Sequence, residues 1–321
     1  MPLISVIVTV YNHGDYLEQC LDSIMAQETE YPYEVIVHDD ASTDGSREVI
    51  KSYCRKYPSI IIPILQDENQ YSQKIPFIQK YILPLVNGKY IAICEGDDYW
   101  TDSRKLERQC SYMEQHPECS LCFHRAIMVK NGKTIGFIAP YSEDVDVSTE
   151  AVIAGGGGFM ATNSIFYPAV YSSMMDVDFF KVAPVGDAPT QAFLATKGTV
   201  HYLNAAMSAY RTMAKGSWSE RTAQSSKKSQ IELCDQMIKM YESLDMYYNN
   251  RYARAVKHIK NTYKIQRLML KDSYSEILNN EELNAALKQM PLGVNLTVRI
   301  SRVAPRLCYI LKIIKRLILC R

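Results

Sequence analysis

The segment from Cys94 to Trp100, with the sequence CEGDDYW, holds the residues of this chain with the clearest capacity for chemistry. It follows the apolar run 90–93, which is typical of a short buried strand. Glu95, Asp97 and Asp98 then occur within four positions, and neighbouring carboxylates repel one another and resist burial. Carboxylates in this arrangement predict a site for a divalent cation or for several hydrogen-bond donors.

Other polar residues follow apolar runs in the same way. Thr9 and Tyr11 lie at the end of the first run, and Asp39 and Asp40 at the end of the second. In an open α/β sheet the ligands bind beyond the carboxyl ends of the strands. The polar residues at these two ends, and those of the segment after residue 93, are therefore expected to converge on one edge of a sheet.

The segments that must position these residues alternate between the hydrophobic period of a strand and that of a helix. Strand-like segments alternate with helical ones, which predicts an α/β fold with a mainly parallel, doubly wound sheet flanked by helices. Ser42 or Thr43 is expected to cap the second helix. The predicted strands are residues 4–10, 33–40, 60–65 and 90–94, and the predicted helices are residues 15–27, 42–57 and 75–86.

The second half of the chain is less regular. A glycine run at 155–158 enters an apolar segment, 184–198 is predicted as a loop followed by a helix, and 200–211 as a strand. Residues 226–290 have a polar, helical pattern. We divide the chain into a catalytic-type domain at 1–218, a helical extension at 219–290 and a basic tail at 291–321.

Composition excludes several classes of protein. The chain is 47% hydrophobic and 22% charged with a formal net charge of +1, which argues against nucleic-acid binding. It shows neither a signal peptide nor an apolar run of membrane-spanning length. The nine cysteines lack a disulfide frame, so a cytoplasmic protein with reduced thiols is expected. Cys119, Cys122 and His124 are too few for a structural zinc site, and we interpret them as strand residues.

Four segments, in order and spacing, resemble the family 2 glycosyltransferases of GT-A fold: ISVIVTVYNHGDYLEQCLDSIMAQ, YEVIVHDDASTDGS, NGKYIAICEGDDYWTDSRKLERQ and PVGDAPTQAFLATKG. The resemblance covers roughly residues 3–215. It implies an inverting, nucleotide-sugar-dependent hexosyltransferase with a helical C-terminal extension. The resemblance also implies roles for individual residues.

GDD stands where the family has its DXD metal motif. The resemblance implies that Asp98 holds Mg²⁺ or Mn²⁺, and that Asp97 contacts the ribose of the nucleotide. The cation would neutralise the diphosphate of the leaving group. The alternative is a charged turn that caps the next helix. Glu95 is expected at most to support this site.

The nucleotide pocket is implied by HDDAS. Asp40 would accept a hydrogen bond from the ring N–H of the base, with Thr9 and Tyr11 flanking the base and Tyr11 stacking on it. This combination favours uridine and leaves guanosine and thymidine open. For Asp39 the alternative role is capping of the following helix.

Asp187 is implied as the general base that deprotonates the acceptor hydroxyl. The family has Glu-Asp at this point and this chain has Gly-Asp, so only the aspartate carries over. Its alternative role is a helix N-cap. Arg211 and Trp218 fall in a segment that resembles the loop closing over the substrates, where they would contact diphosphate and sugar. A surface arginine and a packing tryptophan are the alternatives.

The tail is basic and amphipathic. From Leu283 to Arg321 there are eight lysines and arginines and no acid, and the apolar residues of 305–321 have helical spacing. Such a helix lies at an anionic membrane surface, which would place the enzyme on the inner face of the membrane with a glycan or lipid-linked acceptor in surface polysaccharide synthesis. Packing on the domain or on a partner chain is the alternative.

Two other functions fit the same acids. A sugar nucleotidyltransferase also places metal-binding acids on a parallel sheet, although it carries a glycine-rich basic loop after the first strand, which VTVYNHGDYLEQC lacks. A nucleotide-sugar-binding protein without catalysis is the other alternative. The direction of the Asp187 carboxylate discriminates between an active and an inactive site.

Overall fold

The computed structural model of the chain describes residues 1–303, which form two compact units. Unit 1 contains residues 1–177 and 185–224. Unit 2 contains residues 178–184 and the chain from Ser225 onward. The three domain ranges given above stay a prediction.

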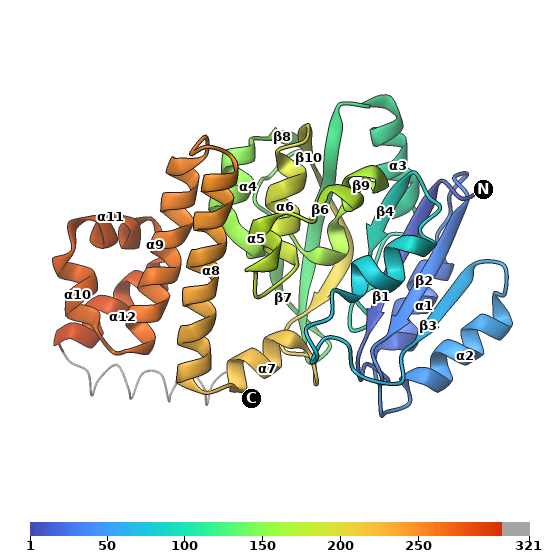
Figure 1. The fold of residues 1–321 in the computed structure, drawn as a ribbon, viewed down its shortest axis with the longest axis horizontal. Coiled ribbons are helices and arrows are strands. Elements are labelled where there is room, and N and C mark those ends of the chain that lie inside the picture. Colours follow the sequence, from blue (N-terminus) through green and yellow to red (C-terminus); the bar gives the residue numbers. More distant parts are fainter. Residues whose placement is uncertain (304–321) are drawn as a thin grey trace. The chain divides into compact units, whose positions relative to one another are not determined.

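Unit 1 is built around a ten-stranded sheet (Figure 1). The strand order is β3-β2-β1-β4-β9-β6-β10-β5, with β7 paired to β6 and β8 to β10. Strands β1 to β4 are mutually parallel, as predicted, while β9 runs antiparallel to both β4 and β6. The bounds are β1 Ile4–Val10, β2 Tyr33–Asp39, β3 Ile61–Leu65, β4 Tyr90–Ile93, β5 Tyr99–Trp100, β6 Cys119–Lys130, β7 Lys133–Ile138, β8 Val145–Val147, β9 Phe166–Pro168 and β10 Thr199–Arg211.

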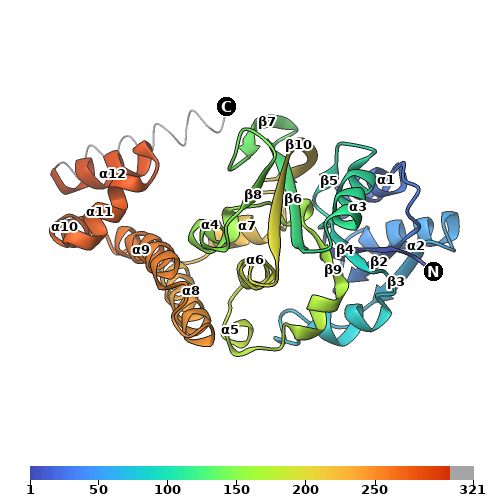
Figure 2. The ribbon, with the colours of Figure 1, turned by 90° about the horizontal axis from the view of Figure 1, so that it is seen from above.

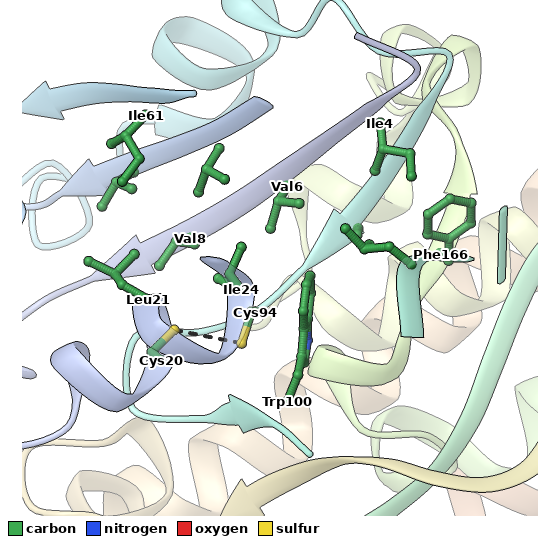
Figure 3. Packing of buried hydrophobic residues seen from close by; sticks show 14 of the residues in the cluster. Ile4, Val6, Val8, Cys20, Leu21, Ile24, Ile61, Cys94, Trp100 and Phe166 are labelled. Carbon is green, nitrogen blue, oxygen red and sulfur yellow. Dashed lines mark hydrogen bonds between the residues drawn. The ribbon is translucent and has the colours of Figure 1, made fainter. Parts of the chain in front are cut away.

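The core of unit 1 lies between this sheet and helices α1 (Leu17–Met25), α2 (Ser46–Lys56) and α3 (Lys105–Gln115). Strands β1 and β2 are rich in β-branched residues, which suit a sheet that is covered on both faces. Figure 3 shows Leu21 and Ile24 of α1 beside Val8 of β1. Burial of each such side chain contributes about 1.5–3 kcal/mol.

Two local predictions are wrong. Helix α2 begins at Ser46 after Gly45, and neither Ser42 nor Thr43 caps it. The Ser42 hydroxyl instead accepts a hydrogen bond from the Asn12 backbone N–H at 2.9 Å. The predicted helix at 75–86 is a π-helical turn, η1 (Ile78–Ile82), followed by a 3₁₀ turn, η2 (Leu83–Leu85). Pro84 has no N–H for an α-helical bond, which prevents a regular helix there.

The rest of unit 1 follows the expected order. The Cys119–Cys122 pair and His124 lie on β6, so their interpretation as strand residues is confirmed. All seven cysteines among residues 1–303 are free thiols. The remaining helices are α4 Thr149–Gly155, α6 Asp187–Ala195 and α7 Trp218–Gln224, with 3₁₀ turns η3 Gly156–Gly158, η4 Thr162–Ser164 and η5 Ala169–Met174.

Unit 2 is helical, which confirms the pattern of residues 226–290. Helices α8 and α9 pack side by side (Figure 2), joined by an ion pair between Arg267 and Asp235 at 2.7 Å. A small core around Ile277 and Leu287 holds the last helices together. The bounds are α5 Asp178–Lys181, α8 Lys227–Tyr247, α9 Ala253–Leu270, α10 Tyr274–Asn279, α11 Glu281–Gln289 and α12 Leu292–Val303.

The predicted tail begins on α12, and its residues 304–321 lie outside the described part of the chain. Among the described helices, none combines the length and apolar character needed to cross a membrane.

Candidate functional site

Strand register brings the predicted polar clusters to one edge of the sheet. Val10 of β1 lies opposite Asp39 of β2, and Ile7 lies opposite Ile93 of β4. The pairing continues past the strand ends, because the Gly96 N–H donates to the Thr9 carbonyl at 2.9 Å. The convergence predicted from the sequence is therefore confirmed.

The loops that leave β1 and β2 are tied together. Asn12 bonds Ser42 through its backbone N–H, and its side-chain Oδ1 accepts from the Thr43 N–H at 2.8 Å. Asn12 and Ala41 both have left-handed φ values, +57° and +62°. The left-handed conformation of Ala41 raises the free energy of the folded state by on the order of 1 kcal/mol. The hydrogen bonds between the two loops offset this.

The two acids of the proposed nucleotide pocket are both buried. Asp40 accepts from the backbone N–H groups of Gln70 and Tyr71, at 2.7 and 3.1 Å. Asp39 accepts from Arg47 Nε at 2.8 Å and from the Ser42 N–H at 3.2 Å, while its Oδ1 is buried without a hydrogen-bond partner. Asp40 thus orders the loop after β3, which forms one wall of this end of the sheet.

Asp98 is buried and joined to β10. Its Oδ1 accepts from the Arg211 backbone N–H at 2.7 Å, and its Oδ2 from Asn163 Nδ2 at 2.9 Å. Asn163 in turn accepts from the Ser208 hydroxyl at 2.6 Å. Burial, with the Asp97 and Glu95 carboxylates, raises the pKa of Asp98 well above its usual range. Asp98 therefore anchors the strand end opposite the acidic turn.

The charge of the candidate base, Asp187, acts on Glu95 of the acidic turn. Burial, followed by the charges of Asp97 and Asp187, raises the pKa of Glu95 to about 8. The charges of Asp97 and Asp187 therefore both act on Glu95. Carboxylates gathered in this way favour a bound cation. The described residues contain no group of three His, Cys, Asp or Glu side chains arranged to hold a metal, so a bound substrate would have to complete any coordination shell.

Asp187 is the first residue of α6. Its Oδ1 accepts from the Ala188 N–H at 2.7 Å, and burial raises the pKa of the carboxyl group. Gly157 faces it: a Cβ at this glycine would lie 3.1 Å from Asp187 Oδ2. A side chain at position 157 would therefore crowd the carboxylate, whose Oδ2 makes no hydrogen bond to the described residues 1–303. Asp187 has no N-cap role, because Gly186 occupies that position.

The Arg211 side chain connects the acidic turn to helix α1. Nη1 donates to the Asp97 carbonyl at 2.5 Å and Nη2 to Gln19 on α1. The guanidinium also lies over the Tyr99 ring, 4.5 Å from its centroid. Trp218, at the start of α7, is 44% exposed. Of these two loop residues, only Arg211 is joined to the acidic turn by a hydrogen bond.

His13 was missed by the sequence reasoning. It is 9% exposed, its Nδ1 has no hydrogen-bond partner, and that atom lies 3.9 Å from Asp97 Oδ1. A Cβ at Gly96 would lie 2.9 Å from it, so glycine there makes room for the imidazole. Burial is the main cause that lowers the pKa of His13, and the charge of Arg221 lowers it by a smaller amount. The Arg221 guanidinium also lies over the Tyr11 ring, 5.9 Å from its centroid. The sequence offered one signal, a histidine two residues after Tyr11.

Lys105 is a second surprise, fully buried on α3. Its Nζ has no hydrogen-bond partner and lies 4.2 Å from the Trp100 ring centroid. Burial lowers the pKa of Lys105 to about 7. A buried ammonium group without a partner destabilises the folded state. Lys105 therefore loses its proton at a lower pH in the folded protein than in water.

This lysine predicts a dependence of stability on pH. Between about pH 7 and pH 10.5 the unfolded chain binds a proton that folded Lys105 has released, so the unfolding free energy rises with pH. Lys105→Met should remove this slope and stabilise the protein at pH 7 by about 2–4 kcal/mol. Urea denaturation from pH 6 to 9 measures both effects, with the exposed Lys51→Met as control. An unchanged slope in Lys105→Met would contradict the prediction.

Comparison with known proteins identifies a family and relatives that this chain resembles. Residues 5–147 match the family model described as glycosyl transferase family 2. An uncharacterized protein of Mycobacterium tuberculosis, Rv1520, is 36% identical over 219 residues, which cover 67% of this chain and 60% of that protein. TuaG of Bacillus subtilis, named as a candidate glycosyltransferase of teichuronic acid biosynthesis, is 32% identical over 157 residues, 48% of this chain and 60% of TuaG.

The chain spans about 60% of the length of these relatives. Among solved structures, residues 1–349 of S. aureus TarS in complex with UDP align with a TM-score of 0.58 and 16% identity, covering 94% of this chain and 87% of that one. This likeness confirms the GT-A-like fold with a helical C-terminal region. Residues 5–147 of this chain therefore belong to glycosyl transferase family 2.

Proposed function

We propose that this chain is an inverting glycosyltransferase that moves a sugar from a nucleotide-sugar, UDP-linked by our inference, to a hydroxyl of a glycan or lipid-linked acceptor in surface polysaccharide synthesis. The observation that carries the proposal is the convergence of the ends of β1, β2 and β4, which brings the acidic turn beside Thr9 and Asp39. The charges of Asp97 and Asp187 both act on Glu95, which supports a place for the candidate base near the same turn. The likeness to UDP-bound TarS supports the choice of nucleotide at the level of the fold.

The donor side lies at the ends of β1 and β2. Tyr11 stacks on the base beside Thr9, and Asp40 accepts the base N–H. Asp97 contacts the ribose. Because Asp40 already holds the 70–71 turn in place, the base would bind against a loop that is ordered before the donor arrives.

A divalent cation fits the acidic turn. Burial, followed by the charges of Asp97 and Asp187, raises the pKa of Glu95, and a divalent cation bound to these carboxylates would favour their ionised form. Asp98 would hold the ion, with Asp97 beside it, and the ion would supply charge neutralisation at the diphosphate. Arg211 braces the turn through the Asp97 carbonyl and is proposed to add charge near the diphosphate; Trp218 is proposed for the sugar side.

Asp187 completes the reaction as general base. The acceptor oxygen attacks the anomeric carbon from the face opposite the leaving group, the bond from that carbon to the phosphate oxygen breaks, and the nucleoside diphosphate leaves. The acceptor proton passes to the Asp187 carboxylate. Its raised pKa favours proton uptake, and only one carboxylate oxygen, Oδ1, is engaged in a hydrogen bond within residues 1–303. This position supports an active enzyme over an inactive binding protein.

The acceptor and the location are inferred from chemistry outside the described site. A basic tail at 291–321 would bring the enzyme to an anionic membrane surface on the cytoplasmic side, where lipid-linked glycans are extended. The name of TuaG, which refers to a cell-surface polymer, agrees with such an acceptor.

A donor screen tests the proposal. The purified chain is incubated with UDP-, GDP- and TDP-sugars in Mn²⁺ or Mg²⁺, and release of nucleoside diphosphate is followed with and without membrane extract. We expect one UDP-sugar to be turned over and EDTA to abolish the turnover. Turnover at full rate in EDTA would exclude the metal role, and donor binding without turnover in membrane extract would favour the inactive protein.

A further inference from the structure

We propose that a hollow at the β7–β8 end of unit 1 binds the saccharide chain of the acceptor, several sugar units away from the hydroxyl that reacts. This inference rests on the proposed function and names a substrate subsite for it. The hollow has a volume of about 580 Å³ and lies between Arg125 of β6 and the loop 139–145.

The loop that forms this hollow is already fixed. Asn204 of β10 donates from its backbone N–H to Asp144 Oδ1 at 2.7 Å and from Nδ2 to the Ser142 carbonyl at 2.5 Å. Strand β8 continues the loop directly into the sheet, by pairing with β10. A loop held at both ends keeps its shape without ligand, so binding would not require it to become ordered.

The lining of the hollow suits a sugar. Arg125 Nε is buried and has no hydrogen-bond partner, although its guanidinium carbon lies 3.8 Å from the Phe137 ring centroid. Glu143 lines the same hollow and is exposed, and no ion pair joins it to Arg125 within residues 1–303. A donor group and an acceptor group held apart match the neighbouring hydroxyls of a pyranose. Tyr141 adds an aromatic surface for the C–H face of the ring.

The balance of charge selects the class of ligand. The hollow contains one cation and one anion, Arg125 and Glu143, so neither an anionic nor a cationic ligand gains a net attraction. A neutral oligosaccharide uses both groups as hydrogen-bond partners and leaves neither unpaired. We therefore assign the hollow to neutral sugar units.

A series of packed residues links the hollow with the candidate base. Tyr141 packs edge-on against Phe159, with ring centroids 6.3 Å apart. Phe159 directly follows the glycine run, where Gly157 lies so close to the Asp187 carboxylate that an added Cβ would be 3.1 Å from Oδ2. A Cβ at Gly158 would meet nothing within 4 Å, so this glycine faces open space. A glycan chain bound in the hollow would run over this series of residues toward Asp187.

Saturation-transfer NMR on the full chain tests this subsite without any need for turnover. The probes are cellotetraose, maltotetraose, chitotetraose and mannotetraose, each with glucose as the short reference. The variants are Arg125→Ala and Glu143→Gln, and the matched control is Arg55→Ala, an exposed arginine on α2. Thermal unfolding checks that each variant is folded, and Glu143→Gln changes only an exposed side chain. UDP binding is measured by calorimetry on the same samples.

We expect at least one tetrasaccharide to bind wild-type protein more strongly than glucose does. Its signal should fall at least fivefold in Arg125→Ala and Glu143→Gln and stay unchanged in Arg55→Ala, with UDP affinity equal in all four proteins. Absence of binding for all four probes, or equal binding in both variants, overturns the assignment. Loss of UDP binding in the wild type would instead count against the proposed function, and it is read separately.

Discussion

Replacement of Asp187 by asparagine should lower the rate of sugar transfer by about 10³-fold or more while the affinity for UDP stays within a factor of two or three. General bases contribute about 10²–10⁴-fold, and the amide cannot accept the acceptor proton. The asparagine oxygen can still accept from the Ala188 N–H, so α6 should begin as before. Glu48→Gln, an exposed carboxylate-to-amide change on α2, is the matched control. Initial rates and calorimetric UDP titrations measure the two quantities.

The pH profile gives an independent test of the same role. The base acts in its ionised form, and burial raises the pKa of Asp187. The rate should therefore fall as pH decreases through a value above the ordinary range of aspartate, and the residual rate of Asp187→Asn should lack this limb. A variant that keeps more than a tenth of the wild-type rate would remove Asp187 from the mechanism.

Asp40, Asp97 and Asp98 could be located from the sequence because they follow apolar strands, whereas Asp187 was located only through the resemblance. Once the strands are parallel neighbours, the register brings Asp40 and Asp97 to the same edge whatever the rest of the chain does. Their partners could not be found in this way. Asn163 reaches Asp98 across 65 residues of sequence, through a 3₁₀ turn that has no distinctive local pattern.

Arg211 is a second residue whose contacts could not be predicted from the sequence. Its segment resembles a loop that closes over the substrates, which suggested a contact with phosphate, but Arg211 is the last residue of β10, and the pairing of β10 with β6 sets its position. In the structure its guanidinium bonds Gln19 and the Asp97 carbonyl, and its backbone N–H bonds Asp98. Composition and periodicity predict which residues reach an edge; they do not predict which of them will be used to hold that edge together.

Asp97 and Asp98 should separate into two roles when each is replaced by alanine. Asp98→Ala leaves Asn163 Nδ2 and the Arg211 N–H without their acceptor in a buried site, at about 1–3 kcal/mol for each group. The unfolding free energy should therefore fall by about 2–5 kcal/mol. Within residues 1–303 the Asp97 carboxylate makes no hydrogen bond, and its nearest ion-pair partner is His13 Nδ1 at 3.9 Å, so Asp97→Ala should change the unfolding free energy by less than about 1 kcal/mol.

Both variants should lose metal-dependent transfer, which makes stability the measurement that separates them. Urea denaturation gives the unfolding free energy, and Mn²⁺ titration in the presence of UDP gives the metal affinity of the protein that remains folded. If Asp98→Ala is as stable as the wild type, then the hydrogen bonds of Asp98 contribute little and its carboxylate is available for a cation. If Asp98→Ala is destabilised and Asp97→Ala alone loses the metal without loss of stability, the ion is held by Asp97, and Asp98 anchors β10 beside it.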